Sequence, residues 1–141
     1  MNIDKFKHQH VDILEGIEAL RRLAHAGVSE NAQAIATRIV ALSGVVRLHL
    51  AVEDRVLYPA LEANGDANLR RMSRTYQTEM EDIASSYLAF ASRWNTAAQV
   101  AERADKFRHE ANTVLKRVFD RMQRENRDFY PAIEAMTLSV A

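Results

Sequence analysis

Apolar residues recur at alternating steps of three and four along four long segments of the chain, which is the pattern of amphipathic helices. The four stripes are Phe6, His10, Ile13, Ile17, Leu20 and Ala24; Ile35, Ile39, Leu42, Val46, His49, Glu53, Val56 and Ala60; Leu69, Met72, Tyr76, Glu79, Ile83, Tyr87, Phe90 and Trp94; and Phe107, Ala111, Val114, Val118, Arg121, Glu125 and Phe129. Only four glycines and two prolines occur in 141 residues, too few for the many turns of a β-sandwich or barrel. We therefore expect an all-α fold, a single-domain up-down-up-down four-helix bundle with helices over roughly 4–26, 30–63, 67–94 and 102–129.

The overall composition argues against several functional classes. The chain has 19 basic and 19 acidic residues, so it lacks the basic excess typical of nucleic-acid-binding proteins. It has no cysteine, which excludes disulfides, thiolate metal sites and cysteine nucleophiles. The first ten residues lack the apolar core of a signal peptide, and we expect no apolar run of transmembrane length. We therefore expect a cytoplasmic protein that binds neither nucleic acid nor membrane, in an oligomeric state that the sequence leaves open.

A 15-residue motif occurs twice in the chain, 72 residues apart. Residues 49–63 (HLAVEDRVLYPALEA) align with residues 121–135 (RMQRENRDFYPAIEA), and seven of the fifteen positions are identical. Both prolines lie in this motif, and the restricted backbone before a proline makes Tyr58 and Tyr130 markers of a helix end or kink. The sequence therefore predicts two similar helical hairpins. They differ where His49 in the first copy is replaced by Arg121 in the second.

Six polar residues stand on the apolar stripes, where the period demands an inward side chain. They are His10, His49, Glu53, Glu79, Arg121 and Glu125. A buried charge without a partner is costly, so these groups should be paired or bind a metal. Helix bundles build iron and manganese sites from imidazoles and carboxylates on facing helices. With neutral histidines the three glutamates and one arginine sum to −2, which one divalent cation neutralises, whereas two would need a bridging hydroxide or oxide.

The chain resembles the hemerythrin-like, HHE cation-binding domain family over about residues 4–135. The resemblance rests on His10, His49, Glu53, Tyr58, Pro59, Glu125, Tyr130 and Pro131. Residues 76–80 and 124–131 are similar to a divergent bacterial branch of this family. The resemblance implies a four-helix bundle with a non-haem di-iron centre that serves oxygen binding, oxygen or redox sensing, or iron handling.

The family's ligands transfer to this chain only in part. The resemblance implies that His10 and His49 hold one iron, and that Glu53 and Glu125 match the two bridging carboxylates. The family's second iron takes two histidines from the third helix and one from the fourth, but the third predicted helix has no histidine and Arg121 stands at the fourth-helix position. We therefore expect a degenerate site with a single ion. The Arg121 guanidinium would take the place of the second cation, bonded to Glu79 or Glu125.

Several alternatives stay open at this point. A carboxylate-rich site for two ions would use Glu79 in place of a histidine, unless Met80 takes the inward position. Tyr58, whose hydroxyl could bond a ligand carboxylate, and His8, near His10, are further candidates beside Glu79 and Arg121. Imidazole with carboxylate suits iron(II), manganese(II) or zinc. Iron is the expectation from the resemblance, with manganese or zinc as alternatives.

The leading functional hypothesis is a non-haem iron protein that senses or buffers iron, dioxygen or another small oxidant. The alternative is a metal-free helical bundle whose buried salt bridges belong to an interaction or regulatory module. Nothing in the sequence marks a substrate pocket, a nucleophile or a phosphate-binding loop. We therefore name no catalytic residue and do not expect an enzyme, although one redox metal is compatible with oxidase or peroxidase chemistry.

Overall fold

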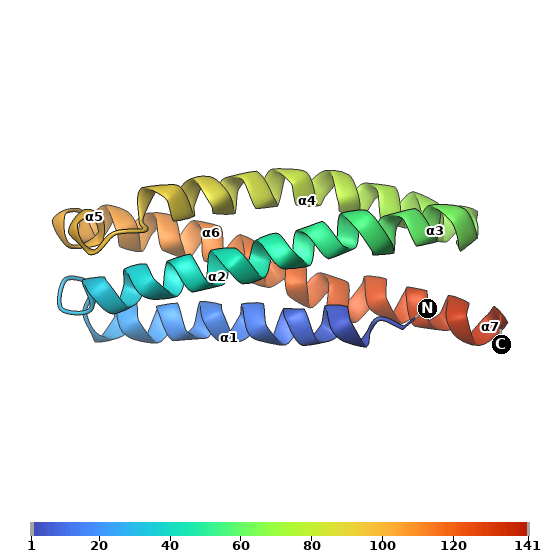
Figure 1. Ribbon diagram of the computed structural model, residues 1–141, viewed down its shortest axis with the longest axis horizontal. Coiled ribbons are helices and arrows are strands. Elements are labelled where there is room, and N and C mark those ends of the chain that lie inside the picture. Colours follow the sequence, from blue (N-terminus) through green and yellow to red (C-terminus); the bar gives the residue numbers. More distant parts are fainter. Residues whose placement is uncertain (1, 141) are drawn as a thin grey trace.

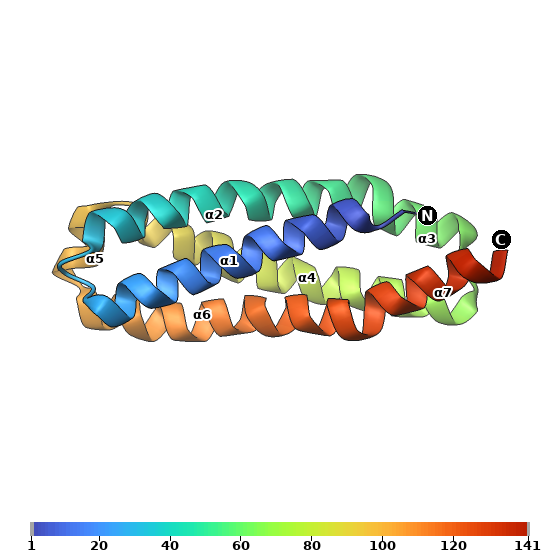
Figure 2. The ribbon, with the colours of Figure 1, turned by 90° about the horizontal axis from the view of Figure 1, so that it is seen from below.

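The protein is an all-α bundle of four long helical segments, as expected. The computed structural model describes the backbone of residues 2–140 and the side chains of residues 2–136. The elements in chain order are α1 Asp4–Ala26, α2 Ala32–Val52, η1 Glu53–Leu57, α3 Tyr58–Asn64, α4 Ala67–Arg93, α5 Ala97–Glu102, α6 Ala104–Arg124, η2 Glu125–Phe129 and α7 Tyr130–Val140. The helical segments run alternately up and down, with both termini at one end and the α1–α2 loop and α5 at the other (Figures 1 and 2).

The fourth helical segment differs from its expected range of 102–129. It begins with α6 at Ala104 and continues through η2 and α7 to Val140. The connection before it contains the short helix α5, which the sequence pattern had not indicated. The Thr96 hydroxyl caps this helix by accepting a hydrogen bond from the Gln99 amide at 3.3 Å. Val100, which is fully buried, anchors the helix to the core.

Each copy of the repeated motif contains a five-residue π-helical turn, η1 in the first and η2 in the second. In η1 the Tyr58 amide donates to the carbonyl of Glu53, five residues earlier. A proline lacks an N–H and clashes with the carbonyl four residues before it, and the wider turn just ahead of Pro59 relieves this conflict. The Tyr-Pro dipeptide therefore marks a change of helix type, and the helix continues beyond it.

The π-turn also changes which side chains face inward. We expected Val56 to be buried, and this is wrong, because Val56 is 53% exposed while Leu57 is fully buried. The extra residue in the turn delays the inward position by one residue.

The core consists of two apolar clusters separated by a polar layer. The larger cluster fills the bundle on the side of α5, and contains Ile13, Val46, Val118 and Met122. The smaller one lies at the end that holds both termini, and contains Ile3, Phe6, Leu57, Tyr76, Phe129, Tyr130 and Ile133 among others. On each of α1, α2–η1 and α6–η2, the buried polar residues fall between members of the two clusters.

The second helical segment, Ala32–Asn64, is long and apolar enough by length and composition to cross a membrane, with a mean hydropathy of 1.6 over its most apolar window. The expectation that no apolar run reaches this length is therefore wrong. The reason is that the segment is apolar on its outer face as well, where Val40, Leu48 and Val56 are each more than half exposed. Its inner face belongs to the core of the bundle, and core helices of bundles share such a composition.

Candidate metal centre

Four of the predicted ligands meet in the polar layer. His10 comes from α1, His49 from the last turn of α2, and Glu53 and Glu125 are the first residues of η1 and η2. All four side chains are at most 1% exposed. Because His49 and Glu53 are four residues apart on one helical segment, their side chains lie on the same face. The structure thus brings together the residues that the sequence pattern selected.

Ligand atoms of His10, His49 and Glu125 converge in this layer, and Glu53 approaches the group at His49. His10 Nε2 lies 3.1 Å from His49 Nε2 and 3.2 Å from Glu125 Oε1. His49 Nε2 lies 2.9 Å from Glu53 Oε1. Ligand atoms of His10, His49 and Glu125 all lie within 4.8 Å of one another. A transition-metal ion with bonds of about 2.1 Å holds adjacent ligand atoms about 3 Å apart, so these spacings suit a single ion.

Two amide side chains fix the histidines in the form that a metal requires. His10 Nδ1 lies 2.8 Å from Asn126 Oδ1, and His49 Nδ1 lies 2.7 Å from Gln9 Oε1. An amide oxygen only accepts, so each Nδ1 carries a proton, and each imidazole in its neutral form presents its Nε2 lone pair to the layer. Metal-binding histidines are oriented in this way in known sites.

The sequence reasoning missed both amides because they lie off the apolar stripes. Gln9 is nevertheless buried, at 7% exposure. The available signal was their position in the chain, since Gln9 directly precedes His10 and Asn126 directly follows Glu125.

Several buried oxygens of the layer have no hydrogen-bond partner. Among the described side chains these are both carboxylate oxygens of Glu53, Oε1 of Glu125 and the hydroxyl of Tyr58. An unsatisfied buried polar group costs about 1–3 kcal/mol, and more when it is charged. Lone pairs of two carboxylates and two imidazoles therefore face one another, and a cation between them satisfies them together. The residues present fit one cation.

The charges of the layer shift the pKa values of its members in a consistent way. Burial, reinforced by the negative charge of Glu125, raises the pKa of Glu53 above its ordinary value. Burial opposes ionisation of Glu125 too, but the contacts with His10 and Arg121 outweigh it and lower the pKa. Burial disfavours the charged form of His49, yet the neighbouring Glu53 and Glu125 raise the pKa of this imidazole. The region around His49 and Glu53 therefore attracts additional positive charge.

Arg121 places a fixed positive charge on the other side of Glu125. Its side chain is buried, and Nε donates to Glu125 Oε2 at 2.7 Å. Nη2 donates to the Tyr76 carbonyl at 2.5 Å, and Nη1 reaches Glu79 Oε2 at 3.5 Å. The guanidinium carbon also lies 4.4 Å from the centre of the Tyr76 ring. Because this guanidinium fills the second half of the layer, the residues do not fit a second cation there.

The remaining candidates lie outside the cluster or at its edge. The Glu79 side chain is 40% exposed and accepts from Arg124 Nη1 at 2.7 Å, while Met80 takes the inward position. His8 is exposed on α1, so the structure gives it no part in the buried cluster. Tyr58 is buried, and burial together with the charges of Glu53 and Glu125 raises the pKa of its hydroxyl.

Tyr130 contacts the cluster, although the sequence reasoning selected Tyr58 as the site candidate. The Tyr130 hydroxyl lies 2.9 Å from His10 Nε2, and the rings of the two residues stack with centroids 4.8 Å apart. The signal for Tyr130 was its place in the second copy of the motif, but only the fold shows which of the two tyrosines lies beside a histidine.

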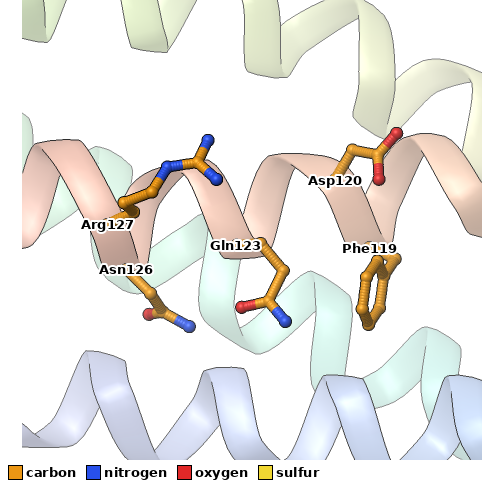
Figure 3. A pocket seen from close by; sticks show the side chains of 5 residues that line it. All are labelled: Phe119, Asp120, Gln123, Asn126 and Arg127. Carbon is orange, nitrogen blue, oxygen red and sulfur yellow. The ribbon is translucent and has the colours of Figure 1, made fainter.

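A surface pocket of about 520 Å³ lies next to the cluster. It is lined by Phe119, Asp120, Gln123, Asn126 and Arg127. Figure 3 shows that Gln123 and Asn126 extend from their helical segment toward α1. Since Asn126 also contacts His10, one side chain touches both the pocket and a candidate ligand.

Comparison with known proteins identifies the family of this chain. The family model described as the hemerythrin HHE cation binding domain matches residues 1–133. No curated protein and no solved structure matches the chain significantly. With the family match covering nearly the whole chain, and with imidazoles and carboxylates facing one another inside the bundle, this protein belongs to the hemerythrin HHE cation-binding domain family.

Proposed function

We propose that this protein binds one iron ion through His10, His49, Glu53 and Glu125, and that it works in the cytoplasm as a sensor or buffer of iron, dioxygen or another small oxidant. The observation that carries the proposal is the convergence of two imidazole lone pairs with carboxylate oxygens that lack hydrogen bonds. Membership in a cation-binding family supports it. Manganese and zinc remain alternatives because the same donors suit them.

The charge of the layer supports one ion over two. Glu79 is paired with Arg124 outside the cluster, so the inner set is Glu53, Glu125 and Arg121, with a sum of −1. One divalent ion brings this sum to +1, whereas two bring it to +3 in a buried site. Burying excess charge is costly, and the Arg121 guanidinium supplies the second positive charge without a metal.

The residues in and around the polar layer have defined parts in this function. Gln9 and Asn126 hold the Nδ1 protons of the two histidines, so both Nε2 atoms are available to an ion without a change of tautomer. Arg121 keeps Glu125 ionised. The apolar clusters on both sides exclude water from the layer. Iron bound at such a site supplies a change between iron(II) and iron(III), which is the chemical basis for responding to oxidants.

Elemental analysis of protein purified without added metal or chelator tests the proposal. We expect about one iron per chain in the wild type, and loss of that iron in His49→Ala, because the imidazole is a ligand. The matched control is His109→Ala, which removes an exposed histidine and should leave the metal content unchanged. His49→Ala protein with full metal content would contradict the assignment of this ligand, and about two irons per wild-type chain would contradict the single-ion site.

Removal of the ion should also destabilise the folded protein. A ligand that binds only the native state adds about 2.7 kcal/mol to the free energy of unfolding when its free concentration is 100 times Kd. Chelator should therefore lower the thermal midpoint of the wild type and leave that of His49→Ala unchanged.

A metal-free interaction or regulatory module is the second candidate function. It is favoured by the network in which Arg121 and Arg124 share Glu79 and lie over the Tyr76 ring. This candidate predicts no co-purified metal and no response to chelator, so the same two measurements separate it from the metal protein.

A further inference from the structure

We propose that the hydroxyl oxygen of Tyr130 is a further direct ligand of the ion held by His10, His49, Glu53 and Glu125, and that it adapts the site to iron(III). This inference rests on the proposed function. It adds to the donor set a residue type that the match to the family does not assign.

Competition for one lone pair carries the inference. His10 Nε2 is approached by three polar atoms, the Tyr130 hydroxyl at 2.9 Å, His49 Nε2 at 3.1 Å and Glu125 Oε1 at 3.2 Å. With its Nδ1 proton directed at Asn126, this imidazole offers a single lone pair to the layer. Once an ion takes that lone pair, the Tyr130 hydroxyl loses His10 as an acceptor and keeps only the Glu125 carboxylate, while its oxygen remains at the spacing of an adjacent ligand.

Packing holds the Tyr130 oxygen in this place. Tyr130 is fully buried, and its ring stacks on the ring of His10 with an interplanar angle of 29°. It also lies beside Phe129, with ring centroids 6.2 Å apart. Packing therefore keeps the Tyr130 oxygen beside His10 Nε2 and the Glu125 carboxylate.

Ionisation of Tyr130 lowers the net charge that iron(III) leaves in the layer, from +2 with a neutral Tyr130 to +1. Binding forms an oxygen–metal bond and breaks the O–H bond, and the proton leaves to solvent. The inner set then sums to −2 from Glu53, Glu125, the Tyr130 tyrosinate and Arg121. Iron(III) brings this sum to +1, the same value that a divalent ion reaches with neutral Tyr130. A tyrosinate oxygen is also a hard anionic donor, which suits iron(III).

Tyr58 provides a matched control within the same chain. It occupies the equivalent position of the first motif copy and is also buried, but its hydroxyl has no hydrogen-bond partner among the described residues. Among the described residues, Tyr130 forms a hydrogen bond and a ring contact with His10, whereas Tyr58 forms neither with a histidine of the cluster. Removing the Tyr58 hydroxyl thus makes the same chemical change as removing that of Tyr130, without touching the His10 side of the layer.

The experiment compares the full-length wild type, Tyr130→Phe and Tyr58→Phe after loading with iron(III) supplied as its citrate complex. A tyrosinate bound to iron(III) produces a charge-transfer band in the visible spectrum, so we expect this band in the wild type and in Tyr58→Phe. Tyr130→Phe should lose the band and bind iron(III) about 10–100 times more weakly. Zinc, measured separately, should still bind at about one ion per chain in all three proteins, which shows that the other ligands and the fold are intact.

Retention of the band in Tyr130→Phe, or its loss in Tyr58→Phe alone, would overturn the inference. If the wild type binds iron or zinc but shows no band, the inference fails and the proposed function stands. If the wild type binds neither ion, both fail. Resonance Raman spectroscopy of the iron(III)-loaded wild type gives an answer even if Tyr130→Phe does not fold, because tyrosinate vibrations must be enhanced in the band when the inference is right.

Discussion

The two copies of the repeated motif place a glutamate at the start of a π-turn and a Tyr-Pro pair after it, yet the two glutamates have opposite environments. Glu53 has only the His49 imidazole beside it, at 2.9 Å, and burial raises its pKa. Glu125 accepts a hydrogen bond from Arg121, and its pKa is lowered. The residue four positions earlier, His49 or Arg121, is the main difference. The first copy of the motif thus supplies ligands for a cation, whereas the second copy carries its own positive charge, the Arg121 guanidinium.

Removing the built-in cation should have the largest effect on stability. Arg121→Met leaves Glu125 buried without its charged partner, and breaking a buried pair in this way costs about 3–5 kcal/mol. Urea unfolding of chelator-treated protein measures this loss. Arg121→Lys serves as the control, because it keeps the charge and should recover part of the stability. A loss of stability below about 1 kcal/mol for Arg121→Met would mean that Glu125 depends on Arg121 less than the contacts indicate, and that the environments of the two glutamates are more alike.

Releasing the histidines from their amide partners should have the next largest effect, on metal affinity. Gln9→Leu and Asn126→Leu each remove the acceptor of an Nδ1 proton, so the imidazole is free to rotate or change tautomer. Such changes typically cost 10–100-fold in affinity, and competition with a fluorescent chelator measures it. Gln123→Leu alters the same pocket as Asn126 without contacting a histidine, and should bind the ion normally. Wild-type affinity in Gln9→Leu would show that this amide does not orient His49.

The third prediction, with a smaller expected effect than the first two, concerns how the stability of the metal-free protein depends on pH. A carboxyl group whose folded pKa is raised stabilises the fold fully below its unfolded pKa, 4.5 for Glu53, and loses that contribution as the pH rises through the folded value. His49, raised from 6.5, loses its contribution in the same direction. Chelator-treated wild type should therefore lose stability as the pH rises above 4.5 for Glu53 and above 6.5 for His49.

Glu53→Gln tests this pH dependence by replacing the carboxylate with a neutral group of similar shape. It should stabilise the metal-free protein above neutral pH, by about 1.4 kcal/mol for each unit by which the pKa of Glu53 is raised, and should flatten the pH profile. The same variant should bind the ion more weakly. Thermal unfolding over a pH series measures both profiles, and an unchanged slope would contradict the raised pKa of Glu53.

Much of this architecture could be predicted from the residues alone. His49 and Glu53 interrupt a long apolar stripe, so their side chains were expected to be buried next to groups that pair with them. The structure places both in the buried layer. The pairing of Arg121 with Glu125 followed from the same spacing.

Other features depend on side-chain rotation that spacing does not determine. Glu79 and Met80 are neighbours at the edge of the inward face, and only packing against the adjacent helices decides that Met80 is buried. Tyr-Pro signalled an interruption of the helix, but a π-turn and a helix end share that signal, so the exposure of Val56 was missed. The contacts of Gln9 and Asn126 could not be read from a period because neither side chain lies on a stripe.

The polar layer has a consequence for how the molecule opens. The smaller apolar cluster contains Ile3 near one terminus and Ile133 near the other, and on α1, α2–η1 and α6–η2 the layer of charged groups separates it from the larger cluster. Parts of a protein with fewer buried apolar contacts open at a lower free energy than the main core. Mutual repulsion within an ion-free layer weakens the junction between the clusters, so both chain ends would become accessible together while the rest of the bundle stays folded. Loss of the ion from a fully buried centre would then change the accessibility of the first turn of α1 and of the start of α7 at the surface.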